Sequence, residues 1–534
     1  MKKIVCLLLA VLMVMSSTSC KSSKKNPSNQ TIFYNLAEDP NSLDPQVAEN
    51  SASEIVITNI FEGLTRIDED NKVIPGAAES FSGNADNTSF TFKLRDGIEW
   101  SDENKTQVTA YDFAYGLKRA VAKETDCPGV QSLFCIKNAR KIHAGESAEL
   151  GVTAIDAKTL QIDLEYSYDD FPRVMSLPAS MPCNQAFFES TNGKYGQEDK
   201  FIICNGPFKV KSKYGWDHGN KIYLSANDGY KGSYERIPAS VEFTIGEDVS
   251  DLISAIDKGK VDAGELKNEQ YSKATELQYN ITAFEDTTYG ICFNFSNDIF
   301  KNLNVRKSFL VSLDREYILK NIPDNCRVAN DIIMDNDVVN GESYRKLSGS
   351  GLYLKQEENA VSYLKSGLKE LGVNSLPSVC VICSDDEKTK SMVSCMIENW
   401  NNQLGYYFNM KPMSKDEIEK SIRLSDYQIA ITSITSETDD PIDVLSMFVT
   451  NDNENPCDMK DSKYDAMVSA AADAPMNEKV EKYKKAEQYL NDVCAFYPLY
   501  YQDRYFASAK NVSSIIFYQH NSGVSFLKAQ KTKK

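Results

Sequence analysis

Apolar and polar residues alternate along several short stretches in the first half of the chain, which is the pattern of half-buried β-strands. The alternation is clearest at residues 32–36, 90–94, 152–154 and 160–164. The last two stretches flank a turn sequence at residues 156–158, which predicts a β-hairpin. A helix is predicted from Thr109 to Ala122, because Thr109 and Asp112 form the pattern of a capping box. We therefore expect roughly the first 280 residues to be rich in strands, with a few helices.

The rhythm changes in the second half of the chain, where apolar residues recur at spacings of three and four. Residues 360–371 and 392–404 have this helical spacing, and each stretch is followed by a glycine that can end a helix, Gly372 and Gly405. Short runs rich in β-branched residues lie at residues 379–382 and 427–431. Helices that alternate with strands predict a mostly parallel α/β lobe. Two parts of different character predict lobes with a cleft between them, where ligands usually bind.

The first thirty residues have the pattern of an export signal. Lys2 and Lys3 precede an apolar run that is too short to span a bilayer, and small residues then lead to Cys20. We expect residues 1–20 to be a lipoprotein signal peptide and residues 21–30 a polar tether. The mature protein is then extracytoplasmic and held on the bacterial membrane by lipid on Cys20. Because Ser17 stands where such signals usually carry Leu, a plain secreted protein is the alternative.

Length and charge narrow the class of protein. A chain of 534 residues has room for about three domains, and its hydrophobic content of 42% allows a large core. The formal net charge is -17 and the basic residues are mostly scattered. Binding of nucleic-acid phosphates requires clustered cations, so we expect no nucleic-acid partner.

The cysteines point to packing more than to redox chemistry. Of the 13 cysteines, the two in the predicted signal peptide leave 11, an odd number. Exported chains often form disulfides, and Cys127 and Cys135 are close enough in sequence to close a small loop. Cys380 and Cys383 form a CxxC inside a strand-like run, whereas a redox CxxC normally opens a helix. We expect most of these thiols to be small core residues.

The sequence offers little catalytic chemistry. The three histidines, His143, His218 and His520, belong to no HExxH motif. There is no GxSxG elbow and no glycine-rich phosphate-binding motif. We therefore expect a non-catalytic protein with no cofactor and no metal, and a secreted hydrolase is the remote alternative.

A group of three acidic residues follows a strand-like run in the second half of the chain. Glu437, Asp439 and Asp440 lie between Ile434 and Pro441. Residues beyond the carboxyl end of a strand in an α/β lobe face the ligand crevice, which makes the cluster a candidate binding site. The alternative is that it caps the amino end of the helix that follows. The local pattern is compatible with both interpretations.

Several segments, taken in order, resemble the substrate-binding lipoproteins of peptide and nickel ABC importers. The resemblance is strongest to the oligopeptide- and dipeptide-binding proteins. Two segments are very close matches, LGVTAIDAKTLQIDL at residues 150–164 and LNVRKSFLVSLDRE at residues 303–316. Weaker matches lie at residues 38–45, 59–68, 92–102, 108–120, 205–210, 462–468 and 498–501. Together they cover nearly the whole mature chain.

The resemblance implies an α/β fold with mixed α+β segments. It is that of a two-lobed clamp, like a periplasmic binding protein, with an additional third domain. Lobe I would comprise residues 31–61, 190–286 and 502–534, the extra domain II residues 62–189 and lobe III residues 287–501. In such proteins the lobes close over the ligand by a hinge motion.

The implied function is that of a receptor. The protein would capture a peptide outside the cell and deliver it to the transmembrane subunits of an ABC permease, acting as a monomer. An extended peptide bound through main-chain hydrogen bonds has high affinity with little side-chain selectivity. The alternative within the family is another solute, such as a nickel chelate or an oligosaccharide.

The resemblance also implies peptide-binding residues in and beside this group of acidic residues. Glu437 matches the acidic residue that pairs with the peptide's amino terminus, and a carboxylate–ammonium bond in a closed cleft is a strong, charge-assisted one. Ser436 and Ile434 belong to the same predicted site. The family more often has Asp at the position of Glu437 and an aromatic residue at that of Ile434.

Two further pairs of residues match ligand-contacting segments of the family. Asn50 and Ser51 match a loop whose backbone contacts the peptide, and a plain surface loop is the alternative. Tyr289 and Gly290 match a strand that enters lobe III, where main chain also contacts the ligand. Tyr289 is equally compatible with a core position.

Overall fold

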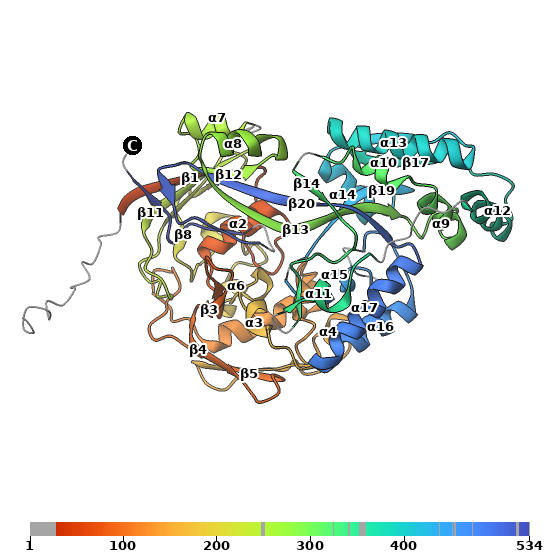
Figure 1. The fold of residues 1–534 in the computed structure, drawn as a ribbon. Coiled ribbons are helices and arrows are strands. Elements are labelled where there is room, and N and C mark those ends of the chain that lie inside the picture. Colours follow the sequence, from red (N-terminus) through yellow and green to blue (C-terminus); the bar gives the residue numbers. More distant parts are fainter. Residues whose placement is uncertain are drawn as a thin grey trace, which may run out of the picture.

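The computed structural model describes residues 28–246, 251–323, 325–339, 342–351, 359–436, 438–450, 452, 455–472, 474–519 and 523–532. Two lobes lie side by side and are connected by two long strands, β13 (Asn280–Phe293) and β20 (Phe496–Ser508) (Figure 1). We use "first lobe" for the strand-rich part on the left of that view and "second lobe" for the part with β17–β19 and helices α9–α17 on the right. The architecture is the predicted two-lobed α/β fold.

Within the described residues, one sheet of 12 strands runs through both lobes. Its order is β18 (Asn409–Met413), β17 (Cys380–Ser384), β19 (Ile429–Thr435), β13, β20, β12 (Ala263–Leu266), β1 (Ser28–Leu36), β11 (Pro238–Ile245), β10 (Lys221–Ala226) and β8 (Phe208–Val210). Off this path, β14 (Cys326–Val328) pairs with β20 and β9 (Trp216–Asp217) pairs with β10. β17 is parallel to both β18 and β19, as predicted for the second lobe.

The first lobe contains a second sheet, of four antiparallel strands. Its order is β4 (Ala78–Gly83), β5 (Ser89–Leu94), β7 (Thr159–Asp163) and β6 (Val152–Ala154). β6 and β7 form the predicted hairpin. Short two-stranded ribbons are β2 (Thr65–Ile67) with β3 (Val73–Pro75), β21 (Val512–Ser513) with β24 (Gln530–Lys531), and β22 (Ile516–Phe517) with β23 (Val524–Ser525). The helices of this lobe are α2 (Ser51–Ile60), α3 (Ala110–Val121), α4 (Ala139–His143), α5 (Phe171–Val174), α6 (Gln185–Ser190), α7 (Leu252–Asp257) and α8 (Tyr271–Glu276).

Helices cover the sheet of the second lobe (Figure 1). They are α9 (Leu303–Val311), α10 (Arg315–Leu319), α11 (Tyr344–Ser348), α12 (Ala360–Leu371), α13 (Glu387–Leu404), α14 (Lys415–Arg423), α15 (Pro441–Ser446), α16 (Ser462–Ala472) and α17 (Met476–Asp492). A short ribbon, β15 (Val338–Val339) with β16 (Glu342–Ser343), precedes α11.

The local signals in the sequence are realised as expected. The buried side chains Ile32, Tyr34 and Leu36 alternate along β1, which places one face of that strand in the core. α12 and α13 end at glycines in the left-handed conformation, with φ of 71° at Gly372 and 74° at Gly405. The capping box of α3 also forms, with the Thr109 backbone N–H donating to an Asp112 carboxylate oxygen at 2.7 Å.

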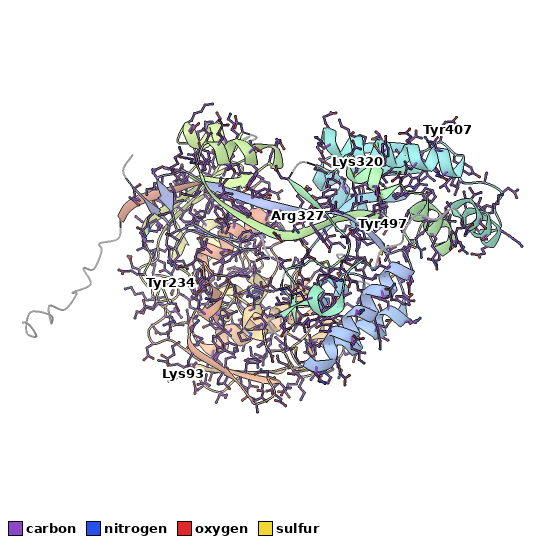
Figure 2. The ribbon with its side chains drawn as sticks, viewed as in Figure 1. Lys93, Tyr234, Lys320, Arg327, Tyr407 and Tyr497 are labelled. Atoms are coloured by element: carbon purple, nitrogen blue, oxygen red, sulfur yellow. The ribbon has the colours of Figure 1, made fainter. Side chains whose placement is uncertain are left out.

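The two connecting strands are irregular where they pass between the lobes. The pairing of β13 with β20 shifts register between Glu285 and Thr287, and Thr287 lies opposite Gln502. Arg327 of β14 lies at this junction (Figure 2) and its guanidinium is 2.9 Å from the Glu285 carboxylate and 3.8 Å from that of Asp503. The register shifts again between Tyr289 and Gly290. A bulge interrupts the ladder of hydrogen bonds and increases the local twist, so strands bend more easily at such points.

The described cysteines are all free thiols, and most are buried. Cys127 and Cys135 remain unpaired, and burial raises the pKa of each thiol to about 12. Burial also raises the pKa of Cys383 in β17 to about 11, the opposite of a reactive redox thiol. These cysteines are therefore packing residues, as predicted.

The export signal and the tether, including Cys20, lie outside the described residues, apart from residues 28–30 at the start of β1. In the part of the chain that is described, no helix has both the length and the apolar character needed to cross a membrane.

Candidate functional site

Four of the predicted site residues lie close together at the inner edge of the second lobe. Tyr289 and Gly290 of β13 lie opposite residues 432–433 of β19, directly beside Ile434 in the antiparallel pairing. Ser436 follows immediately after the end of β19. The sheet thus brings together segments that are far apart in sequence.

Tyr289 and Gly290 pack closely against residues of β20. The Tyr289 ring stacks on the ring of Tyr500 in β20, with centroids 4.9 Å apart and planes 9° apart. A Cβ atom at Gly290 would lie only 2.3 Å from the Phe496 ring and 2.5 Å from the Tyr497 carbonyl oxygen. Close backbone approach therefore explains the glycine, and a ligand would meet these two residues chiefly through their main chain.

Ile434 is a core residue. Its side chain is 5% exposed and packs in the same hydrophobic cluster as Val444 and Phe448 of the following segment. The position thus carries an aliphatic side chain that packs in the core of the second lobe.

The turn after β19 is fixed on both sides of Glu437, which itself lies outside the described residues. The Ser436 hydroxyl donates to the Thr438 carbonyl oxygen and also lies 3.1 Å from a carboxylate oxygen of Asp443. The Thr438 backbone N–H donates to the same Asp443 oxygen at 2.8 Å. Ser436 is thus a buried positioning residue for the turn.

Asp440 caps α15. Its carboxylate accepts a hydrogen bond from the Ile442 backbone N–H at 3.0 Å, and Pro441 occupies the first helical position. This confirms the capping interpretation for Asp440. Capping accounts for one carboxylate oxygen of Asp440, and it does not account for the other acidic residues at this turn.

Four carboxylates gather at this turn, and we call Asp337, Asp439, Asp440 and Asp443 the acidic cluster. Asp337 comes from the segment before β15, and the Val338 backbone N–H donates to the Asp439 carbonyl oxygen at 2.8 Å. Burial, followed by repulsion from the other three aspartates, raises the pKa of Asp337 well above its usual range. Burial likewise raises the pKa of Asp440, against the attraction of Lys479.

The acidic cluster faces the first lobe across a boundary that we call the seam. The Asn71 side-chain amide lies 3.5 Å from an Asp439 carboxylate oxygen. The Lys479 ammonium of α17 lies 5.9 Å from the centre of the Tyr168 ring of the first lobe. On the first-lobe side, Arg173 binds both the Asn71 amide oxygen at 3.0 Å and the Asn71 carbonyl oxygen at 2.9 Å, which fixes that residue at the seam.

A solvent-open hollow of about 400 Å³ lies along the seam. On the first lobe it is lined by Pro128, Gly129, Gln131 and Ser132. On the second lobe it is lined by Asp443, Ser446, Met447 and Asp452. The acidic cluster therefore borders open space between the lobes through Asp443.

Asn50 and Ser51 lie in the first lobe at the start of α2. The Asn50 side chain accepts a hydrogen bond from the Ser53 backbone N–H at 2.9 Å and donates to the Asp39 carbonyl oxygen at 3.0 Å. Ser51 is exposed at the first position of the helix. Asn50 is thus an N-cap with both ends of its amide in use, a role that the sequence analysis did not assign.

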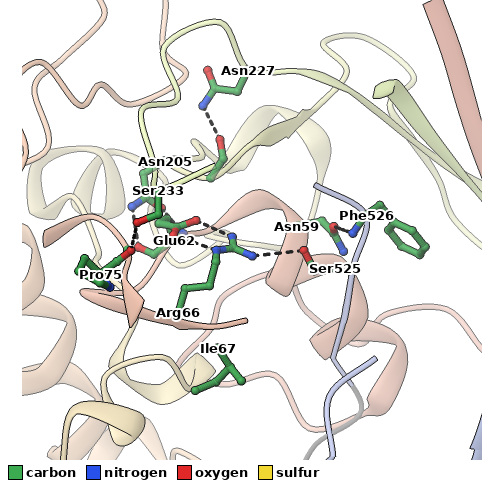
Figure 3. A network of polar contacts seen from close by, with 12 residues as sticks. Asn59, Glu62, Arg66, Ile67, Pro75, Asn205, Asn227, Ser233, Ser525 and Phe526 are labelled. Carbon is green, nitrogen blue, oxygen red and sulfur yellow. Dashed lines mark hydrogen bonds and ion pairs between the residues drawn. The ribbon is translucent and has the colours of Figure 1, made fainter. Parts of the chain in front are cut away.

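A separate ionic network joins α2 to the C-terminal segment (Figure 3). Glu62 and Arg66 form a buried two-pronged pair, with Arg66 Nε and Nη2 at 3.0 and 2.5 Å from the two carboxylate oxygens. Arg66 Nη1 also donates to the Ser525 hydroxyl at 3.2 Å. The Asn205 side chain bonds the backbone N–H and carbonyl oxygen of Glu62. A hollow of about 410 Å³ lies beside this pair and includes Tyr518 in its lining.

Metal binding receives no support from the described residues. Among them, no group of three or more His, Cys, Asp or Glu side chains converges in a way that could hold a metal ion. That statement includes the four carboxylates of the acidic cluster.

The geometry can now be compared with known proteins. The family profile described as "Bacterial extracellular solute-binding proteins, family 5 Middle" matches residues 72–456. The chain belongs to this family. The dipeptide-binding protein DppE of Bacillus subtilis is 26% identical over 502 residues, which cover 92% of this chain and 90% of DppE.

Solved structures of the family have the same fold. The substrate-binding domain of an oligopeptide ABC transporter from Bacillus anthracis superposes with a TM-score of 0.79 at 24% identity, covering 95% of this chain and 99% of that one. The murein tripeptide-binding protein MppA of Escherichia coli and an unliganded open form of MppA are each 21% identical to this chain, and each comparison covers 95% of this chain. One gives a TM-score of 0.78 and covers 99% of that chain, whereas the unliganded open form gives 0.65 and covers 98%.

Sequence reasoning found the turn of this family 5 protein but missed two of its neighbours. Asp337 lies about 100 residues before the turn and has no motif of its own, so only the fold brings it to Asp439. Asn71 joins the seam from the first lobe in the same way. In the sequence Asp337 is one of three aspartates in the mixed polar and apolar stretch at residues 330–339, a composition that is too common to be specific.

Proposed function

We propose that this family 5 protein is the extracytoplasmic receptor of an ABC importer, which captures peptides between its lobes and delivers them to the permease. The observation that carries the proposal is the match to peptide-binding relatives along almost the whole chain, in sequence and in fold. The protein acts without catalysis, and its binding energy comes from lobe closure over the ligand.

The hinge of the clamp is assigned to the irregular part of β13 and β20. We place lobe I at residues 31–61, 190–286 and 502–534, domain II at 62–189 and lobe III at 287–501. Thr287 lies opposite Gln502 where the register of the two strands shifts, which supports these boundaries. A bend at this point moves the acidic cluster relative to the first lobe without disturbing either core.

Glu437 is the proposed anchor for the peptide's amino terminus. The contacts of Ser436 and Thr438 on either side of it fix the backbone of the turn at the inner edge of the second lobe. A carboxylate there binds an ammonium group in a poorly solvated cleft, where such a bond is strongest. Ser436 and Ile434, together with Tyr289 and Gly290, offer main-chain groups to an extended peptide, and Asn50 and Ser51 offer theirs from the first lobe.

The experiment is a binding titration by calorimetry with the body that starts at residue 31. Wild type should bind a peptide with a free amino terminus about tenfold or more tightly than the N-acetylated form, and Glu437→Gln should lose most of that difference. Equal losses of affinity for both peptides would remove the anchor assignment. Peptide turnover in the same mixture, followed by mass spectrometry, would replace the receptor with the hydrolase alternative.

The identity of the solute is tested on the purified protein itself. Native mass spectrometry should find a mixture of short peptides that copurify with the closed clamp. A single nickel chelate or oligosaccharide in their place would keep the receptor function and change the cargo.

Membrane attachment through Cys20 is part of the same proposal. A receptor that serves a permease gains from staying within reach of it, and residues 21–30 give a flexible tether. A mass for the N-terminal fragment that fits a lipid-modified Cys20 is the expected result, and an unmodified N-terminus in the culture medium would support plain secretion.

A further inference from the structure

One buried carboxylate of the acidic cluster, that of Asp337, has no positive charge bound to it in the described part of the chain. Asp337 is 4% exposed, and its Oδ2 atom has no hydrogen-bond partner among the described residues. Its backbone is held in place, because the Tyr344 N–H donates to the Asp337 carbonyl oxygen at 2.7 Å. A buried carboxylate without a partner costs considerable free energy, so such a group in a folded protein calls for an explanation.

Neighbouring carboxylates destabilise the ionised form of Asp337 further. Asp439, Asp440 and Asp443 face it from the turn after β19 and the start of α15. From the first lobe, Asp170 faces the same region and is repelled by Asp439 and Asp440. Five carboxylates thus converge on the described part of the seam.

No cation is bound to Asp337 itself among the described residues. Arg345 of α11 is the cation that attracts Asp337, but its guanidinium is bound to Glu487 at 2.5 Å and lies 3.5 Å from Asp331. Lys479 attracts Asp440, and Arg173 is bound to Asp170 at 2.9 Å. In the described part of the chain Asp337 therefore lies among like charges without a counter-charge of its own, and Asp443 of the same cluster lines the hollow between the lobes.

The chemistry of the missing partner follows from the geometry. The carboxylates do not converge as metal ligands, as described above. An organic cation needs no such convergence, because an ammonium or guanidinium group donates several hydrogen bonds to carboxylates spread around it. The cluster begins two residues after the turn position of Glu437, the proposed anchor for the amino terminus, so a cation carried close to that end of a peptide would reach it.

We propose that Asp337, with Asp439 and Asp440, forms a subsite for a second positive charge of the ligand, a lysine or arginine side chain near the amino end of a bound peptide. This inference rests on the proposed function and adds a substrate preference to it. While the clamp is empty, protons take the place of that charge on the cluster. A basic side chain displaces them when it binds.

The test compares two tetrapeptides that differ only in lysine or norleucine at the second residue, so that the stem is kept and the charge is removed. Wild type should bind the lysine peptide about tenfold more tightly, since a charge-assisted bond in a poorly solvated site has about this effect. Asp337→Asn should reduce the preference to about threefold or less and leave the norleucine affinity unchanged. Asp335→Asn removes a neighbouring exposed carboxylate and should leave the preference intact.

A second measurement does not depend on any variant. Calorimetric titrations of wild type at mildly acid pH, in two buffers with different heats of ionisation, should show proton release on binding of the lysine peptide and much less on binding of the norleucine peptide. Equal affinities and equal proton release for the two peptides would overturn the subsite and leave the proposed function standing. Failure to bind either peptide, or a mixed peptide library, would overturn the proposed function itself.

Discussion

Two buried ionic groups in this protein differ in whether their charges are balanced. In the first lobe, Glu62 and Arg66 form a two-pronged pair and Ser525 takes a further guanidinium N–H. In the second lobe, Asp337 lies among like charges with one oxygen unpartnered among the described residues. Both groups are almost completely shielded from solvent, so burial alone does not separate them.

The difference shows what each group does. A buried pair whose members satisfy each other joins segments, and here it connects Glu62, just after α2, and Arg66 of β2 to the C-terminal segment (Figure 3). A buried carboxylate in excess is costly and persists where something else balances it. The Glu62–Arg66 pair is therefore a structural joint between chain segments, whereas the carboxylates around Asp337 form the proposed ligand-binding subsite.

The largest expected effect comes from breaking the joint. Glu62→Gln leaves the buried Arg66 guanidinium without its counter-charge, and loss of one partner of a buried pair typically costs about 3–5 kcal/mol. Glu62 no longer offsets the burial that opposes the charged form of Arg66, but a guanidinium has an intrinsic pKa so high that the arginine stays charged in the variant. Denaturation by urea should show this loss as a lower midpoint.

An exposed pair supplies the control for that measurement. Glu79 lies 3.1 Å from Lys93, with side chains 42% and 63% exposed. Glu79→Gln should change the free energy of unfolding by about 0.5 kcal/mol or less. If Glu62→Gln were as mild as Glu79→Gln, the joint would contribute no more than a surface contact and the comparison would fail.

Removing a charge from the acidic cluster should raise the stability of the unliganded protein, by a smaller amount and in a way that depends on pH. The pKa values of Asp337 and Asp440 are raised in the folded protein, so the folded state binds more protons than the unfolded state. The contribution of these groups is therefore fully present below the pKa of an unfolded aspartate and is lost as pH rises through the raised, folded values. The unliganded protein should thus lose stability as pH rises from acid to neutral.

Asp337→Asn removes that dependence from one group. At neutral pH the variant should melt about 2 °C or more above wild type in the absence of ligand, because a neutral amide is not repelled by Asp439, Asp440 and Asp443. The gap should close as pH falls. A melting temperature that drops at all pH values would mean that Asp337 is part of a balanced structural network like that of Glu62.

The sequence predicted the fold well because its signals are local. The alternation in β1, the capping box at Thr109 and the glycines that end α12 and α13 each act within a few residues, and the structure realises all of them. The site was predicted less completely, because its parts meet only after the lobes pack. Asp337 is brought to Asp439 because the backbone N–H of its neighbour Val338 donates to the Asp439 carbonyl oxygen, and no local pattern anticipates this bond between distant segments.

The smallest predicted effect concerns Asn50, a predicted site residue, and tests whether its side chain has a structural role or contacts the ligand. Asn50→Ala removes the N-cap of α2, which accepts from the Ser53 N–H, and should cost about 1 kcal/mol of stability. Asn50→Asp keeps an acceptor and should recover most of that loss, since aspartate is also a favoured cap. Because Asn50 is expected to meet a peptide only through its backbone, peptide affinity should be the same in both variants and in the neighbouring Ser51→Ala. A fall in affinity for Asn50→Ala that Asn50→Asp does not restore would make its side-chain amide a ligand contact and move this residue from the balanced class to the ligand-binding one.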